Sequence, residues 1–178
     1  MDGLDRAALM RVLRRQAVII TLFVVAVGCA AVAPVAAAAD DRPEVWATVN
    51  VCDTPAAPNT IGIRASMPGS RNGQARRYMR FVVQYFSRVD DRWHRVPAGG
   101  DSGYLSIGKG RKARQFGRSL RIEPNAGEPV LLRGRVYFQW RVKGDVVRRA
   151  SALTHKGHRS SAGADPPGYS ASTCTVKD

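Results

Sequence analysis

Alternation of apolar and polar residues is the main pattern of the chain after residue 39. Between positions 78 and 88 the apolar residues of the alternation are Met79, Phe81, Val83 and Tyr85. Between positions 135 and 143 they are Val136, Phe138, Trp140 and Val142. Since successive side chains of a strand point to opposite faces, this pattern predicts strands with one buried face and one solvent face.

Weaker versions of the same pattern cover 45–51, 61–67, 92–96, 116–122, 130–132 and 146–150. The pairs Asp90-Asp91 and Gly144-Asp145 lie between such segments and predict β-hairpins. No window after residue 39 has helical spacing. The sequence therefore predicts an all-β fold, an antiparallel immunoglobulin-like β-sandwich of about seven strands, preceded by an N-terminal apolar signal helix.

The first 39 residues differ from the rest. Arg6, Arg11, Arg14 and Arg15 precede an uncharged stretch from 17 to 39, in which Pro34 and several alanines follow the apolar centre. A positive head, an apolar middle and small residues at the end are typical of a secretory signal. We predict a signal peptide over 1–39, cleavage after Ala39, a single domain over 40–178, and a secreted protein.

Two other interpretations of this segment remain open. Residues 17–39 are long enough to cross a bilayer, so an uncleaved helix would anchor the protein in the cell membrane. The run Ala26-Val27-Gly28-Cys29 is also similar to a lipoprotein signal, in which Cys29 would carry the lipid. In either case the membrane would be reached only through this segment.

Two cysteines remain beyond the leader, Cys52 and Cys174. An even pair in an exported chain is expected to oxidise, because the compartment outside the cytoplasm permits disulfides. We therefore predict a Cys52–Cys174 bridge that joins the first strand region to the last.

Two resemblances accompany these patterns. The strand 136–142, with its Gly144-Asp145 turn, resembles the final hairpin of immunoglobulin-like or fibronectin-III-like modules. The cysteines lie near the ends of the domain and depart from the pairing of central strands in those modules. Segments 52–64 and 164–170 resemble functionally uncharacterised small secreted proteins of high-GC Gram-positive bacteria, which supports export and implies no chemistry.

The chain is strongly basic, with a net charge of +14, and +12 remains after the leader's four arginines and two aspartates are removed. Such a charge favours anionic partners, although the excess of arginine over lysine also fits GC-rich coding. The densest positive segment suggests an anion-binding loop with two neighbours on a later hairpin: Lys109, Arg111, Lys112, Arg114, Arg148 and Arg149. The expected partners are an anionic envelope polymer, lipid headgroups or another envelope protein, and cytoplasmic nucleic acid is not expected.

Candidate catalytic groups are few. Gly100-Asp101-Ser102-Gly103 resembles the nucleophile segment of trypsin-like serine proteases, but the only histidine upstream is His94. His155 and His158 could begin a metal site, but the basic loop around them would repel a cation. We expect no cofactor, no metal and no enzyme activity. The alternative is a small extracellular hydrolase or inhibitor that uses Ser102, His94 or the pair His155/His158.

Overall fold

The structure is a computed structural model that describes residues 45–123 and 128–177. The predictions for the leader concern the signal helix, cleavage after Ala39, the 17–39 span and lipidation of Cys29. All of them lie outside the described residues. Within the described ranges, no helix is long and apolar enough to cross a membrane.

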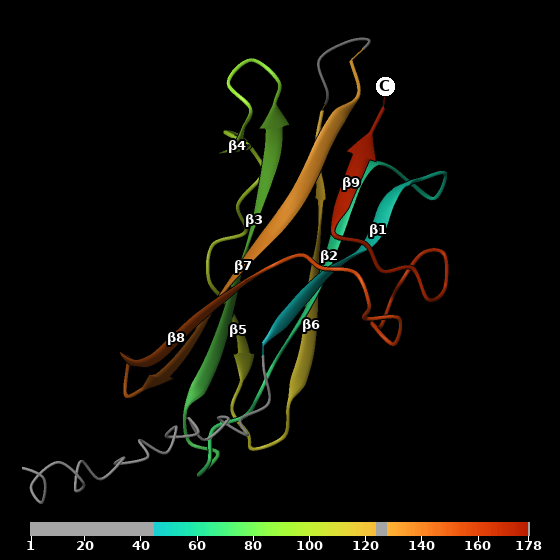
Figure 1. Cartoon of the computed structure of the whole chain (residues 1–178). Helices are drawn as coiled ribbons and strands as arrows, with labels where there is room; N and C mark the ends of the chain where they lie inside the picture. The colour runs from blue at the N-terminus through green and yellow to red at the C-terminus, as the bar shows by residue number, and fades with distance from the viewer. Residues whose placement is uncertain (1–44, 124–127, 178) are drawn as a thin grey trace, which may run out of the picture. The chain divides into compact units, whose positions relative to one another are not determined.

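The described part of the chain is all-β and contains no helix. Its strands are β1 (Trp46–Thr54), β2 (Ala57–Met67), β3 (Arg76–Ser87), β4 (Arg92–Arg95), β5 (Leu105–Gly108), β6 (Arg114–Arg121), β7 (Val130–Val142), β8 (Asp145–Leu153) and β9 (Thr173–Val176). Every pairing between these strands is antiparallel. The predicted all-β antiparallel class is therefore confirmed (Figure 1).

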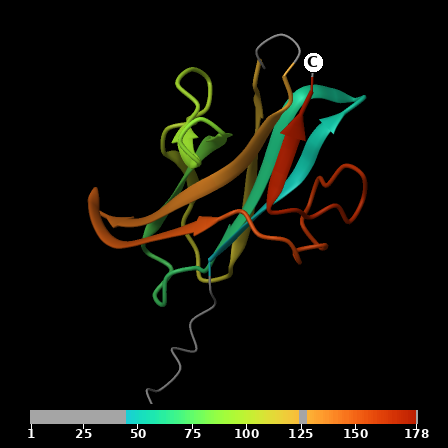
Figure 2. The ribbon, with the colours of Figure 1, turned by 45° about the horizontal axis from the view of Figure 1, so that its top comes forward.

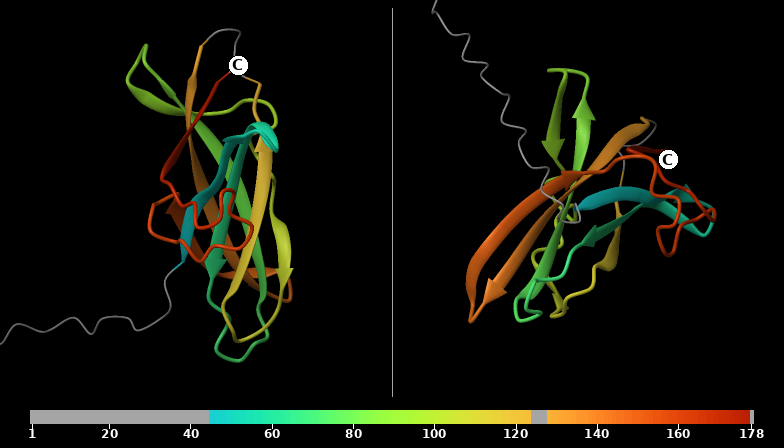
Figure 3. Two further views of the ribbon diagram at one scale, coloured as in Figure 1. Left: turned by 90° about the vertical axis from the view of Figure 1, so that its right-hand side faces the viewer. Right: turned by 60° about the horizontal axis from the view of Figure 1, so that its bottom comes forward.

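The strands form two sheets. The smaller sheet has the order β1-β2-β6, and the larger has the order β4-β3-β7-β8. β5 pairs with β3 on the same side as β4, at the opposite end of the strand, and β9 pairs with β7 beyond the end of β8. In the left panel of Figure 3 the smaller sheet lies in front and β7 behind it.

The apolar residues of the alternation form one core between the sheets. Phe81, Val83 and Phe138 are fully buried, and Trp140 is 2% exposed. They belong to the same cluster as Val49 and the other inward residues of the smaller sheet. Since burial of apolar area is the main favourable term in folding, this shared cluster is what holds the two sheets together. The predicted common interior is confirmed.

Several local predictions need correction. The segments 130–132 and 135–143 belong to one strand, β7, and the short strands β5 and β9 were not predicted. The β7–β8 turn consists of Lys143 and Gly144, with φ of 52° and 99°, while Asp145 already begins β8. A two-residue hairpin loop with positive φ at both positions matches the twist of the strands, and glycine adopts that φ at little cost.

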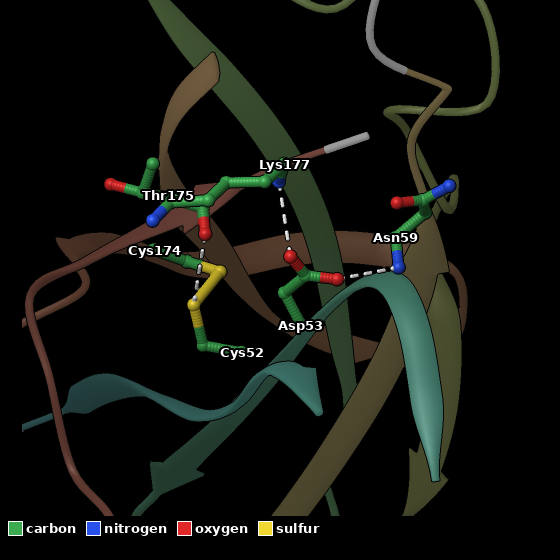
Figure 4. Close-up of a disulfide and its surroundings, with 6 residues drawn as sticks. All are labelled: Cys52, Asp53, Asn59, Cys174, Thr175 and Lys177. Atoms are coloured by element: carbon green, nitrogen blue, oxygen red, sulfur yellow. Dashed lines mark hydrogen bonds between the residues drawn. A yellow bond between two sulfur atoms is a disulfide. The ribbon is translucent and has the colours of Figure 1, made fainter. Parts of the chain in front are cut away.

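The predicted disulfide is present and joins the two sheets. Cys52 lies in β1 and Cys174 in β9, with their Cα atoms 5.4 Å apart. Next to it, the Asp53 carboxylate accepts hydrogen bonds from the backbone N–H of Asn59 (2.8 Å) and of Lys177 (3.0 Å). Figure 4 shows this carboxylate between the start of β2 and the C-terminal segment. The bridge and the carboxylate together fasten the last strand to the first hairpin.

The segment between β8 and β9 covers the free edge of β1. Backbone hydrogen bonds join Val49 and Ala171 in both directions, at 2.9 and 3.0 Å, and His155 N–H donates to the Ala47 carbonyl. Asp165 N–H donates to the Asn50 carbonyl, so the edge is engaged along much of its length. Figure 2 shows this segment running beside β1. The covered edge leaves fewer unpaired backbone groups for association with other strands.

Candidate functional site: a basic end of the domain

Three segments that are far apart in sequence meet at one end of the domain. They are the loop 68–75 before β3, the loop 109–113 between β5 and β6, and the tip of the β7–β8 hairpin, and all lie toward the lower part of Figure 1. Ser70 N–H donates a hydrogen bond to the Gly110 carbonyl (3.1 Å), which joins the first loop to the second. We call this region the basic end.

A buried arginine organises the second loop. Arg77, at an inward position of β3, is only 1% exposed. Its guanidinium donates to the carbonyl oxygens of Gly108 (3.3 Å), Lys109 (3.1 Å) and Lys112 (2.8 Å). A buried cation needs hydrogen-bonding partners, and here backbone carbonyls supply them without a carboxylate. The loop is therefore held in one conformation and the charge of Arg77 is not neutralised.

Glycines make this close packing possible. A Cβ atom on Gly69 would lie 2.0 Å from the carbonyl oxygen of Arg111, so no larger residue fits there without movement of the backbone. Gly108 and Gly110 have φ of 85° and 137°, a region that residues with a side chain seldom adopt. Gly108 and Gly110 thus allow the backbone conformation of this loop.

One pocket of the basic end has three arginines in its wall. Arg71, Arg111 and Arg148 line a cavity of about 600 Å³ together with Trp140 and Val147. The Arg148 guanidinium carbon lies 4.4 Å from the centre of the Trp140 ring, in cation–π contact. None of the three guanidinium groups forms an ion pair with a carboxylate in the described residues. The pocket can therefore receive an anionic group beside an apolar one.

A second pocket lies on the other side of the β7–β8 hairpin. This cavity has a volume of about 560 Å³, and its wall includes Arg76, Lys109, Arg141 and Lys143, with Tyr78. Of the described part of the chain, four cationic side chains and no carboxylate line this cavity, so it too is suited to anions.

Nearly all of the charged side chains in the basic end are positive. Within 68–78, 108–116 and 141–149 the only acidic residue is Asp145, whereas the basic side chains are Arg71, Arg76, Arg77, Lys109, Arg111, Lys112, Arg114, Arg141, Lys143, Arg148 and Arg149. Desolvation lowers the pKa of Arg77, and the charge of Arg114 lowers it further. Such crowding of like charges raises the free energy of the unliganded protein, and an anion would relieve it.

The six residues that the sequence suggested are divided among different places. Arg111 and Arg148 line the three-arginine pocket, and Lys109 lines the pocket across the hairpin. Arg114 donates to the Ile107 carbonyl at 2.8 Å, the Lys112 side chain is exposed, and Arg149 is on the outer face of β8.

Five further cations of the basic end, Arg71, Arg76, Arg77, Arg141 and Lys143, were not among these six. They belong to segments that only the strand pairing brings together. The sequence does concentrate basic residues beside turns that contain glycine, at 69–77 and 141–149, and this pattern was the one that could have indicated them.

The Ser102 hydroxyl is engaged with the backbone. It accepts a hydrogen bond from Phe81 N–H (2.9 Å) and donates to the Gly103 carbonyl (2.8 Å). His94 Nε2 is instead 2.7 Å from the Asp90 carboxylate, across the β3–β4 turn. A nucleophilic serine needs its hydroxyl hydrogen-bonded to a base, and these contacts give Ser102 a structural role in fastening its loop to β3.

His155 and His158 have different surroundings. The His158 ring stacks on Trp46, with centroids 4.2 Å apart and planes 8° apart, while His155 Nδ1 is bonded to the Lys156 carbonyl (2.8 Å). Desolvation lowers the pKa of His158, and the neighbouring His155 lowers it further. No group of three or more metal-ligating side chains occurs among the residues that the structure describes.

Comparison with known proteins adds no family. No protein-family model matches the chain, and no curated protein sequence matches it.

Proposed function

We propose that the protein is a non-catalytic binding module of the cell exterior that attaches to anionic groups through its basic end. The observation that carries this proposal is the pocket in which Arg71, Arg111 and Arg148 face an open cavity with no carboxylate partner among residues 45–123 and 128–177. Guanidinium groups bind phosphate and carboxylate oxygens through paired N–H donors, and an unneutralised set of three gives both affinity and faster encounter.

We propose an extracellular or envelope location on two grounds. The leader has the three parts of a secretory signal, and a disulfide joins Cys52 and Cys174. N-terminal sequencing of the protein released by cells that express the full chain tests this. A start at Asp40 is expected, whereas an intact Met1 or a lipid-bearing Cys29 would favour the anchored alternatives.

We further propose that the domain is an immunoglobulin-like sandwich. The orders β1-β2-β6 and β4-β3-β7-β8 correspond to the orders A-B-E and C′-C-F-G of that fold, which supports the proposal. The disulfide is different, because it joins an edge strand to the short C-terminal strand β9. An experimental structure that paired the strands in another order would contradict this proposal.

The absence of catalysis is also part of the proposal. It is supported by the engagement of the Ser102 hydroxyl with two backbone groups and by the pairing of His94 with Asp90. Incubation with a broad-specificity serine-reactive phosphonate tests it, since covalent labelling at Ser102 would favour a hydrolase.

The binding experiment compares two charge-matched double variants with the unaltered protein. R111Q/R148Q removes two charges from the pocket, whereas R88Q/R118Q removes two exposed charges elsewhere. Sedimentation with vesicles that contain an anionic phospholipid, and with insoluble envelope material, measures attachment at several salt concentrations. We expect at least about tenfold weaker binding for R111Q/R148Q than for R88Q/R118Q, from the loss of two charge-assisted contacts of about 1 kcal/mol each. Equal binding of the two variants would refute the pocket as the site.

A further inference from the structure

The outer face of the larger sheet carries a second concentration of arginine, separate from the three-arginine pocket. The residues that alternate with the core positions on β3, β7 and β8, together with Arg95 of β4, supply Arg76, Arg80, Arg95, Arg133, Arg135, Arg141 and Arg149. Among the described residues, the one carboxylate that forms an ion pair with an arginine of this face is that of Asp101, whose backbone bridges to Val82 of β3. The face is therefore a positively charged strip across a pleated surface.

Arg133 is fixed in place without being neutralised. Its Nε donates to the Gln84 side-chain oxygen at 2.9 Å, and its guanidinium carbon lies 4.2 Å from the centre of the Trp93 ring. An amide acceptor and an aromatic face orient the guanidinium, but neither carries a negative charge. The charge of Arg133 thus stays available to a ligand.

Arg141 repeats this arrangement at the other end of the face. Its Nε and Nη2 donate to the Gln139 side-chain oxygen at 2.9 and 2.6 Å, and its guanidinium carbon lies 4.3 Å from the centre of the Tyr78 ring. The same pair of devices, a glutamine oxygen and an aromatic ring, therefore holds an arginine at two places on one sheet. Prior ordering of a long side chain lowers the entropy lost when it binds a ligand.

Arg80 lies between these two positions and differs from Arg133 and Arg141. It is bound by the Asp101 carboxylate, with Nε at 2.8 Å from Oδ1, so its charge is already paired. Near it, burial raises the pKa of Tyr137, but the neighbouring Arg135 and Arg95 together lower it by more, so the net shift is downward. Desolvation and the charge of Arg135 lower the pKa of Arg133, which agrees with positive charge that lacks compensation.

The spacing of the two fixed arginines indicates the size of the ligand. Arg133 is opposite Gln84 and Gln139 is opposite Tyr78, so the two arrangements are six residues apart along β3. At about 3.3 Å per residue this separation is roughly 20 Å. A small anion cannot contact both, whereas a chain with regularly spaced anionic groups can.

The aromatic rings indicate the chemistry of that chain. Single-stranded nucleic acids and many sugars bind by stacking on exposed aromatic faces. Here Trp93 and Tyr78 each have one face covered by an arginine of the protein itself, and Phe86 packs beside Trp93 at 5.3 Å. The geometry favours recognition of the anionic groups over recognition of rings.

We infer that the outer face of β4, β3, β7 and β8 binds a linear phosphate polymer without aromatic bases, such as a polyol-phosphate chain, with Arg133 and Arg141 as its two fixed contacts. The two fixed arginines lie outside the three-arginine pocket of the proposed function, and Arg141 also lines the second pocket of the basic end. This inference adds the partner's chemistry, a polymer of repeating phosphate, and its path along the face, from the hairpin end toward Trp93.

The test uses inorganic polyphosphate of two defined lengths, one well over 20 Å and one of only three phosphates, with the full chain as purified. Calorimetric titration should show that the long chain binds at least about tenfold more tightly per molecule. In R133Q/R141Q this preference should fall to within about twofold, and the slope of log K against log salt should drop by about two. R88Q/R118Q, with the same net charge, should keep both.

A second pair of variants separates orientation from charge. R133K/R141K keeps both charges but cannot use the amide and the ring in the same way. We expect the salt slope to be preserved and the affinity for long polyphosphate to fall at least about threefold. Q84A and Q139A change no charge, and each should also lower the affinity for long polyphosphate. Thermal unfolding of each variant checks that the fold is kept.

Four outcomes would overturn the inference. One is equal loss of binding in R133Q/R141Q and R88Q/R118Q, which would assign the effect to bulk charge. Another is tighter binding of a single-stranded oligonucleotide of equal charge, which would indicate base recognition, and a third is a preference for anionic vesicles over long polyphosphate. A fourth is abolition of polyphosphate binding by R111Q/R148Q alone, which would place the site in the three-arginine pocket and not on the outer face.

Discussion

Arg77 donates a 2.8 Å hydrogen bond from Nη1 to the carbonyl oxygen of Lys112, so that a buried cation holds the backbone of an exposed basic loop. The two residues belong to β3 and to the loop before β6. Because the same guanidinium also bonds Gly108 and Lys109, one side chain determines the conformation of the loop from which Lys109 and Arg111 project.

Replacement of Arg77 by Met should therefore destabilise the domain and loosen this loop. Three carbonyl oxygens would lose their donor, and we expect a loss of about 2–4 kcal/mol in the free energy of unfolding, from three hydrogen bonds of about 1 kcal/mol each. Urea denaturation measures this loss. Arg76→Met, at the exposed neighbouring position, is the control and should change the stability by less than about 0.5 kcal/mol.

The disulfide should contribute a large share of the stability. Cys52 and Cys174 are 122 residues apart, and in the chain-entropy model closing a loop of this length stabilises by about 4–5 kcal/mol. We expect C52S/C174S to unfold at a much lower denaturant concentration than the oxidised protein. Addition of a reductant should lower the midpoint of the oxidised protein but leave that of C52S/C174S unchanged. Insensitivity of both proteins to the reductant would show that the bridge does not form.

His158 should make stability depend on pH. Desolvation beside Trp46, and then the charge of His155, lower its pKa in the folded state, so the folded state favours the neutral imidazole. The resulting stability is fully present above the ordinary histidine pKa of about 6.5 and decreases as pH falls through the lowered folded value. We expect the unfolding midpoint to fall with acidification in this range and the Trp46 fluorescence to change with it. His158→Gln should remove that part of the dependence, whereas His94→Gln should not.

Gly134 of β7 is a position where the packing permits no side chain. A Cβ atom there would lie 2.5 Å from Cδ1 of Ile63 and 2.8 Å from Cγ2 of Thr154. Gly134→Ala should cost about 1–3 kcal/mol of stability, typical of overpacking in a core. Thermal unfolding compares it with Ser151→Ala on the exposed face of β8, for which a change near zero is expected. A neutral Gly134→Ala would mean that the two sheets lie farther apart than described.

The sequence contained enough information for the strands and much less for the sites. Period-two alternation identified the inward residues of β3 and β7 because burial of one face depends only on local spacing. The same alternation could not reveal Arg77, since a charged residue at an inward position gives no apolar signal. Similarly, Gln84 and Arg133 are 49 residues apart, and nothing local to either residue indicates that they pair.

The sequence by itself determined the all-β class, the sign of the charge and the number of cysteines left to pair beyond the leader. These properties follow from composition and from neighbours a few residues away. Only the tertiary structure decided which arginines face one another, which are neutralised by carboxylates and which are held ready by glutamine and aromatic side chains. Strand order and register bring those groups together, and both are set by the packing of the two sheets on a common core.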